Sequence, residues 1–225
     1  MKNILLIRHG ESESNAGVVT EHPKTVALTE LGRKQAQAVA DLIHTPPQRI
    51  VYSPYARSLQ TALPTMEKFP QVPCEEWPIQ EFTYLNPKKY YHTTKADRHP
   101  MSEQYWEACD PQFQEGEGES FEQFLDRMEA TYHRLEEHPE RILLFTHGHV
   151  IRMLLWFFLS GLPRHRERTM VKYRALRQGI YIPNGAVLGL SLAPERSMSP
   201  LLTDHLPLEL LSNQDKFPPR QNEGL

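Results

Sequence analysis

The chain has 225 residues, of which 39% are hydrophobic and 24% charged, the usage of a soluble globular protein. Its 25 basic and 28 acidic residues give a net charge of −3, which argues against a protein that coats nucleic acid or a membrane surface. Two cysteines outside any metal-binding spacing are typical of a reducing compartment. The most apolar stretch, residues 151–162, is shorter than the roughly 20 residues that cross a bilayer. We therefore expect a cytoplasmic protein with no nucleic-acid or membrane partner.

Short apolar runs alternate with segments of helical spacing along most of the chain. The predicted elements are, in order, strand 3–7, helix 28–43 with Thr29 as N-cap, strand 50–52, helix 55–69, helix 121–135, strand 142–145, helix 148–159 and strand 187–192. Strands that alternate with helices predict an α/β domain with a largely parallel sheet.

Two segments fit neither periodicity. Residues 82–120 carry aromatic side chains among polar ones and indicate a long insertion, of the kind that usually serves as a lid or binding loop. Residues 193–225 hold five prolines and short leucine groups, so this tail is either weakly ordered or docked on the body or on a partner. We expect one domain over residues 1–192, followed by this tail. The leucines of the tail could form the contact of a homodimer.

Basic residues follow three of the predicted strands. The segments are Arg8-His9-Gly10, Ser53-Pro54-Tyr55-Ala56-Arg57 and Thr146-His147-Gly148-His149. Because the carboxyl ends of parallel strands share one edge of a sheet, two arginines and two histidines should converge there. Such a cluster repels itself unless an anion binds, and arginine forks and helix N-termini both suit phosphate. The sequence therefore predicts a phosphate site.

The same residues resemble a known family. Five blocks, in order, are similar to those of the histidine phosphatase superfamily in its phosphoglycerate mutase-like branch: Arg8-His9-Gly10-Glu11-Ser12 with Asn15, residues 28–36, Tyr52-Ser53-Pro54 with Arg57 and Thr61, Gly118-Glu119-Ser120, and Thr146-His147-Gly148. The blocks cover about residues 1–190. The resemblance implies a three-layer α/β/α fold with a mostly parallel central sheet, and a phosphoric monoester hydrolase like the histidine acid phosphatases.

The resemblance also implies roles for individual residues. His9 would attack phosphorus to form a phosphohistidine, while Arg8, Arg57 and His147 would hold the phosphoryl oxygens. Glu81 would protonate the leaving group and later activate water. The residues that would contact phosphate or substrate are Asn15, Glu21, Gly148 and Tyr84. No cofactor or metal is required.

Plainer readings stand beside these assignments. Glu81 lies in a glutamate-rich stretch and an exposed surface position is the commoner case; Tyr84 can simply pack the insertion. His147 and His149 would make two metal ligands, but no further ligand completes the set. At the level of function, the alternatives are a mutase of the phosphoglycerate type and a catalytically idle regulatory or binding module.

Charge bears on the substrate. The basic stretches that bind a second phosphate in the mutases are not recognisable after Glu81, and a carboxylate at Glu21 would disfavour a strongly anionic leaving group. Residues 101–140 hold 12 acidic and two basic residues, a net of −10. This acidic segment either lies over the pocket and repels polyanions or forms a remote solvated face. We expect a small, modestly anionic phosphate ester as substrate.

Overall fold

Strands and helices alternate along the computed structural model, which describes residues 3–138, 141–163, 165–192 and 196–213. The strands in these ranges are β1 (Asn3–Arg8), β2 (Arg49–Tyr52), β3 (Cys74–Glu76), β4 (Ile142–Thr146), β5 (Val187–Ser191) and β6 (Ser197–Leu202). The helices are α1 (Glu30–Leu42), α2 (Ala56–Lys68), α3 (Lys95–Ala108), α4 (Phe121–Glu137), α5 (Gly148–Ser160) and α6 (Arg166–Gly179), with short 3-10 helices at Pro87–Tyr90 and Leu208–Leu210.

One sheet joins these strands in the order β3-β2-β4-β1-β5-β6. β1 to β4 run parallel to one another, whereas β5 is antiparallel to β1 and β6. Arg8 pairs with Thr146 and Tyr52 with Phe145, so the carboxyl ends of β1, β2 and β4 lie at one edge. Because β5 is antiparallel, its first residue, Val187, lies at that same edge beside Ile7.

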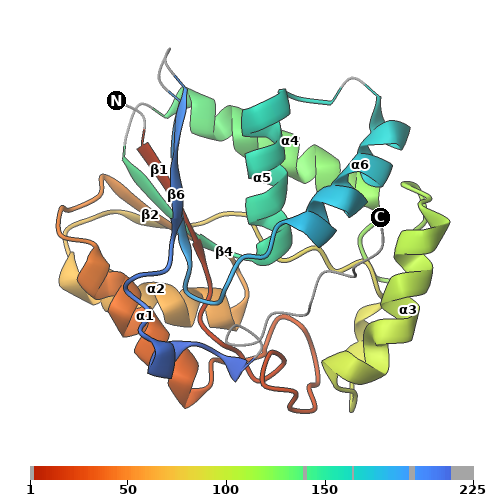
Figure 1. Ribbon diagram of the computed structural model, residues 1–225, viewed down its shortest axis with the longest axis horizontal. Coiled ribbons are helices and arrows are strands. Elements are labelled where there is room, and N and C mark those ends of the chain that lie inside the picture. Colours follow the sequence, from red (N-terminus) through yellow and green to blue (C-terminus); the bar gives the residue numbers. More distant parts are fainter. Residues whose placement is uncertain (1–2, 139–140, 164, 193–195, 214–225) are drawn as a thin grey trace.

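Helices cover both faces of the sheet, as Figure 1 shows. Successive side chains of a strand point to opposite faces. Leu6 and Leu144 accordingly belong to the core that α3, α4, α5 and α6 cover, while Ile7 and Phe145 pack with α1 and α2. This arrangement confirms the predicted three-layer α/β/α fold with a mostly parallel sheet.

Two helices were not predicted from the sequence. α3 lies inside the 82–120 insertion, begins at a capping box between Thr94 and Asp97, and contains Pro100. The proline and a weak apolar periodicity hid this helix, whose buried residues include Arg98 and Trp106. α6 carries many charged residues, and these left too few apolar positions for its helical period to be recognised.

The C-terminal tail contributes an edge strand that the sequence did not predict. β6 pairs with β5, and its side chains are exposed or half-buried, so main-chain pairing rather than burial defines it. Pro200 within it is tolerated at a sheet edge. For residues 196–213 the structure thus shows a docked segment; the rest of the predicted tail, residues 193–195 and 214–225, lies outside the described residues. Within the described ranges, no helix has the length and apolar character needed to cross a membrane.

Candidate active site

His9 follows β1 at the carboxyl edge of the sheet and is only 3% exposed. Its Nδ1 lies 2.7 Å from the carbonyl oxygen of Gly10, which can only accept, so Nδ1 carries the proton. Nε2 is then an unprotonated lone pair, and it accepts a hydrogen bond from Nε of Arg57 at 3.2 Å. Burial, followed by the charges of Arg57 and Arg8, holds the pKa of His9 well below its ordinary value. The imidazole is a neutral base whose one ring lone pair, on Nε2, is held by Arg57 and could attack once that hydrogen bond is given up.

The glycine after His9 lets the chain pass very close to α1. A Cβ on Gly10 would overlap the carbonyl oxygen of Gly32 in α1, and a Cβ on Gly32 would overlap that of Glu11. The Gly10 amide donates to the hydroxyl of Thr61 at 3.0 Å, which ties the loop to α2. This double glycine contact fixes the backbone that carries His9.

Two arginines flank the His9 ring. Arg57, from the first turn of α2, is 8% exposed, and its Nη1 donates to the carbonyl of Pro23 at 2.7 Å. Nη2 of Arg57 has no acceptor among the described residues. Arg8 donates through Nη1 to the carbonyl of Ile182, and its buried Nε has no acceptor in the same ranges. Both side chains line the cavity beside His9 and retain N–H groups for an anion.

His147 is the N-cap residue of α5 and is fully buried. Its ring centre lies 5.0 Å from that of His9, although His147 is not among the residues that line the cavity. Nε2 lies 2.7 Å from the hydroxyl of Ser53, and Nδ1 has no hydrogen-bond partner among the described residues. Burial, with the charge of Arg57 next in importance, holds the pKa of His147 well below its ordinary value.

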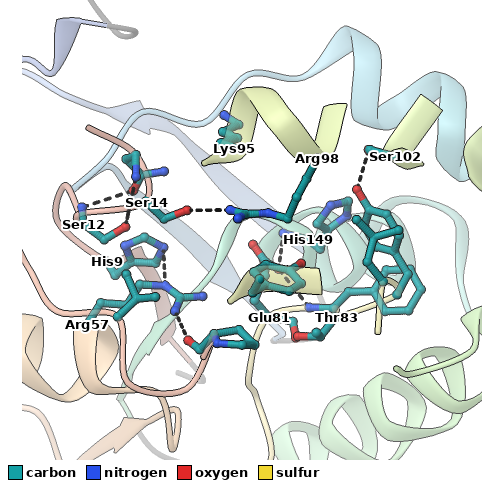
Figure 2. A pocket seen from close by; sticks show the side chains of 18 of the residues that line it. His9, Ser12, Ser14, Arg57, Glu81, Thr83, Lys95, Arg98, Ser102 and His149 are labelled. Carbon is teal, nitrogen blue, oxygen red and sulfur yellow. Dashed lines mark hydrogen bonds between the residues drawn. The ribbon is translucent and has the colours of Figure 1, made fainter. Parts of the chain in front are cut away.

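Glu81 lines the cavity at the N-terminus of α5. Its Oε1 accepts from the backbone amide of His149 at 3.0 Å and from that of Phe82 at 3.2 Å. Gly148, also in the lining, leaves room for the neighbouring side chains. A Cβ there would lie 2.9 Å from Nη1 of Arg152 and 3.8 Å from Oε2 of Glu81. Figure 2 shows Glu81 between the His9 side of the pocket and His149.

Asn15 is oriented by three donors. Its Oδ1 accepts from the amide and hydroxyl of Ser12, at 3.2 and 2.9 Å, and from Nδ2 of Asn184 at 3.1 Å. Asn184 is fully buried and also donates to the His9 carbonyl at 3.1 Å. Sequence reasoning missed Asn184, because a residue before a strand was not expected at the carboxyl edge; the antiparallel direction of β5 brings it there.

Of the two remaining residues that were predicted to contact the substrate, Tyr84 lies in the cavity wall and Glu21 does not. Tyr84 lines the cavity, and its hydroxyl is 2.6 Å from that of Ser102, while its ring stacks on Tyr105. Glu21 is exposed and lines neither described cavity. Of the acidic residues that the structure describes in segment 101–140, only Glu103 lines the main cavity, and Glu117 and Glu119 line a smaller one. That segment therefore does not cover the cavity with negative charge.

The cavity has a volume of about 380 Å³ and opens beside His9, between the loop after β1 and α3 (Figure 2). Arginine N–H groups, an oriented amide and a helix N-terminus surround a neutral histidine, an arrangement that suits a tetrahedral oxyanion. In the described part of the chain, no three His, Cys, Asp or Glu side chains gather in a way that could hold a metal ion.

Comparison with family models matches residues 4–187 to the histidine phosphatase superfamily, branch 1. The chain belongs to this superfamily. The match covers most of the chain and includes the ordered blocks that carry the resemblance, so the predicted family is confirmed.

Curated relatives of this superfamily member bear the names of phosphatases. A metal-independent phosphoserine phosphatase from Arabidopsis thaliana is 30% identical over 158 residues, which are 67% of this chain but only 66% of that protein. An adenosylcobalamin/alpha-ribazole phosphatase from Salmonella typhimurium strain LT2 is 30% identical over 67% of this chain and 76% of its own. The alpha-ribazole phosphatase structure from Shigella flexneri, at 22% identity, covers 89% of this chain and 96% of its own with a TM-score of 0.70, and it supports the fold.

Proposed function

We propose that this chain is a metal-independent phosphomonoesterase that hydrolyses a small phosphate ester through a phosphohistidine on His9. One observation carries the proposal: His9 presents an unprotonated Nε2 beside Arg57, in a cavity that also holds the carboxyl group of Glu81. A nucleophile, cationic donors and an acid–base group in one cavity suffice for phosphoryl transfer.

In the first step, His9 Nε2 attacks phosphorus and the bond from phosphorus to the ester oxygen breaks. Glu81 gives its proton to the departing alkoxide, so an alcohol leaves and Glu81 becomes a carboxylate. Arg8, Arg57 and the amide of Asn15 hold the three equatorial oxygens, where transition-state charge develops. The hydrogen bond from Nδ1 of His9 to the Gly10 carbonyl stabilises the ring as it becomes cationic.

In the second step, the Glu81 carboxylate takes a proton from a water molecule as its oxygen attacks phosphorus. The bond from phosphorus to Nε2 breaks, inorganic phosphate leaves, and both His9 and the protonated Glu81 are restored. His147, neutral and held by Ser53, would meet the phosphoryl group through Nδ1. Arginines supply the positive charge that a metal ion would otherwise bring.

The relatives point to the size of the substrate. One name mentions phosphoserine, which is a small phosphate ester, and the other mentions adenosylcobalamin and alpha-ribazole. A cavity of about 380 Å³ suits ligands of this size.

The experiment compares the wild type with His9→Ala on p-nitrophenyl phosphate in buffer with and without EDTA. We expect His9→Ala to lose hydrolysis at least about 10³-fold, and EDTA to change nothing. His133→Ala, at an exposed histidine on α4, is the control and should retain full activity. Retained hydrolysis in His9→Ala contradicts the proposal. Return of the phosphoryl group to the alcohol instead of release as phosphate identifies a mutase.

A further inference from the structure

Tyr55, the N-cap residue of α2, contacts both halves of the site and has no role in the mechanism above. The guanidinium carbon of Arg57 lies 4.9 Å from the centre of the Tyr55 ring, and the His147 ring makes a T-shaped contact with it at 5.4 Å between ring centres. The backbone amide of Tyr55 donates to the hydroxyl of Ser53 at 3.2 Å. Tyr55 is thus fixed against the residues that are proposed to hold the phosphoryl group.

The hydroxyl of Tyr55 connects this half to Glu81. It lies 2.9 Å from the hydroxyl of Thr83, which in turn lies 3.2 Å from the carbonyl oxygen of Glu81. A carbonyl oxygen only accepts, so the single proton of the Thr83 hydroxyl is donated to Glu81. The Tyr55 hydroxyl must then donate to Thr83, and burial raises the pKa of Tyr55, which keeps this donor protonated. A chain of two hydrogen bonds therefore runs from Tyr55 to the main chain of Glu81.

The segment that carries Glu81 needs such a support, because it lies between two cavities. Glu81 and Thr83 line the main cavity and also the smaller one, which has a volume of about 240 Å³. Phe82, between them, is buried and stacks on Phe124 with the ring centres 4.5 Å apart. Packing thus anchors the middle of the segment, whereas the residues on either side of Phe82 depend on hydrogen bonds for their positions.

A packing role for Tyr55 explains only part of this geometry. A phenylalanine ring would make the same contacts with Arg57 and His147, because these contacts use the face and the edge of the ring. Tyr55 is half-buried and lines the smaller cavity, so packing does not require a protein partner for its hydroxyl. What the hydroxyl adds is the contact with Thr83.

We propose that Tyr55 is a positioning residue which, through Thr83, holds Glu81 so that its carboxyl group meets the leaving oxygen of the ester. The ring of Tyr55 rests against Arg57 and His147, so the acid is held in a fixed place relative to the bound phosphoryl group. This inference rests on the phosphatase activity and on the role of Glu81 proposed above. It gives one residue the task of aligning phosphoryl binding with proton transfer.

The test measures kcat/KM for a series of aryl phosphates whose leaving phenols become less acidic, from p-nitrophenyl phosphate to phenyl phosphate. Tyr55→Phe keeps the ring and removes the hydroxyl. We expect it to lower kcat/KM about 5- to 20-fold on phenyl phosphate but less than about threefold on p-nitrophenyl phosphate, because a misplaced acid slows poor leaving groups most. Thr83→Val should give the same pattern, whereas Thr83→Ser keeps the hydroxyl and should keep the wild-type pattern.

Two further variants sharpen the test. Tyr132→Phe removes a buried hydroxyl of α4 that has no partner within the described ranges, and it should change neither rate. The double variant Tyr55→Phe/Thr83→Val should lose no more than the single variant with the larger loss, because either change breaks the same chain. No loss in Tyr55→Phe, an equal loss across the series, or losses that multiply in the double variant would each overturn the inference and leave Tyr55 a packing residue.

Failure of the proposed activity is recognised separately, as absence of hydrolysis of every ester by the wild type. The amide resonance of His149 then reports where the acid lies, because this amide donates to Oε1 of Glu81 at 3.0 Å. A shift of that resonance in both Tyr55→Phe and Thr83→Val supports the inference. An unchanged resonance overturns it.

Discussion

The hydroxyl of Ser53 lies 2.7 Å from Nε2 of His147, and both residues are fully buried. Ser53 follows β2, and His147 follows β4, so the contact joins two neighbouring strand ends. Because Nε2 is engaged by Ser53, the orientation of the ring directs Nδ1, which has no protein partner in the described ranges, away from the hydroxyl. The proposed mechanism uses this Nδ1 toward the phosphoryl group.

Ser53→Ala should therefore reduce kcat/KM for an aryl phosphate by about 10- to 100-fold, because His147 loses the contact that fixes its ring. The reduction should appear mainly in kcat. Thr131→Val removes another buried hydroxyl, which donates to the Arg127 carbonyl within α4, and it serves as the control. Equal kinetics for Ser53→Ala and Thr131→Val would show that the Ser53 contact has no catalytic role.

Glu81→Gln should lower the rate most for esters with poor leaving groups. An alkoxide needs the proton of Glu81, whereas p-nitrophenolate leaves readily without one. We expect kcat to fall by about 10²- to 10⁴-fold on an alkyl phosphate and by much less on p-nitrophenyl phosphate. Glu76→Gln, at an exposed position in β3, should change neither rate. A uniform loss on both esters for Glu81→Gln would rule out the proton-donor role.

Gly10→Ala should destabilise the fold, because the added methyl group would overlap the carbonyl oxygen of Gly32. The backbone of the loop after β1 or that of α1 would then have to move. We expect a loss of about 3 kcal/mol in the free energy of unfolding, measured in urea. Gly179→Ala is the matched control: a Cβ there meets no atom within 4 Å, at the end of α6. It should be neutral or stabilising by up to about 1 kcal/mol. Similar stability of the two variants would contradict the close approach.

The buried histidines predict how stability depends on pH. The pKa values of His9 and His147 lie below the ordinary value in the folded protein, so these rings stay neutral while unfolded chains take up protons below about pH 6.5. The free energy of unfolding should therefore decrease as pH falls through that window. Urea titrations from pH 7.5 to 5.5 should show a shallower decrease for His9→Asn, by up to about 1.4 kcal/mol per pH unit. An unchanged slope would contradict a neutral His9.

The sequence predicted the parts of the site that depend on parallel strand ends. His9, Arg57 and His147 each follow a strand with clear apolar character, and parallel pairing brings such ends together whatever the details of packing. Glu81 was expected from the family resemblance rather than from the strand ends, and it lines the cavity together with His9 and Arg57.

Other parts needed the tertiary structure. α3 lacks a clear apolar period, so neither the helix nor the inward position of Arg98 could be predicted. Asn184 reaches the site only because β5 is antiparallel, and strand direction is not encoded in a local pattern. Glu21 was expected near the substrate from the resemblance alone, and the path of the exposed loop after β1 takes it away.

The most direct measurement is a millisecond alkaline quench of the wild type during turnover of a phosphate ester, followed by mass spectrometry of its peptides. Phosphohistidine survives alkali, so the intermediate can be assigned to a residue. The proposed mechanism predicts one phosphoryl group, on His9, that appears before inorganic phosphate and is absent from His9→Asn. Steady hydrolysis of the ester with His9 unmodified at every quench time would contradict it.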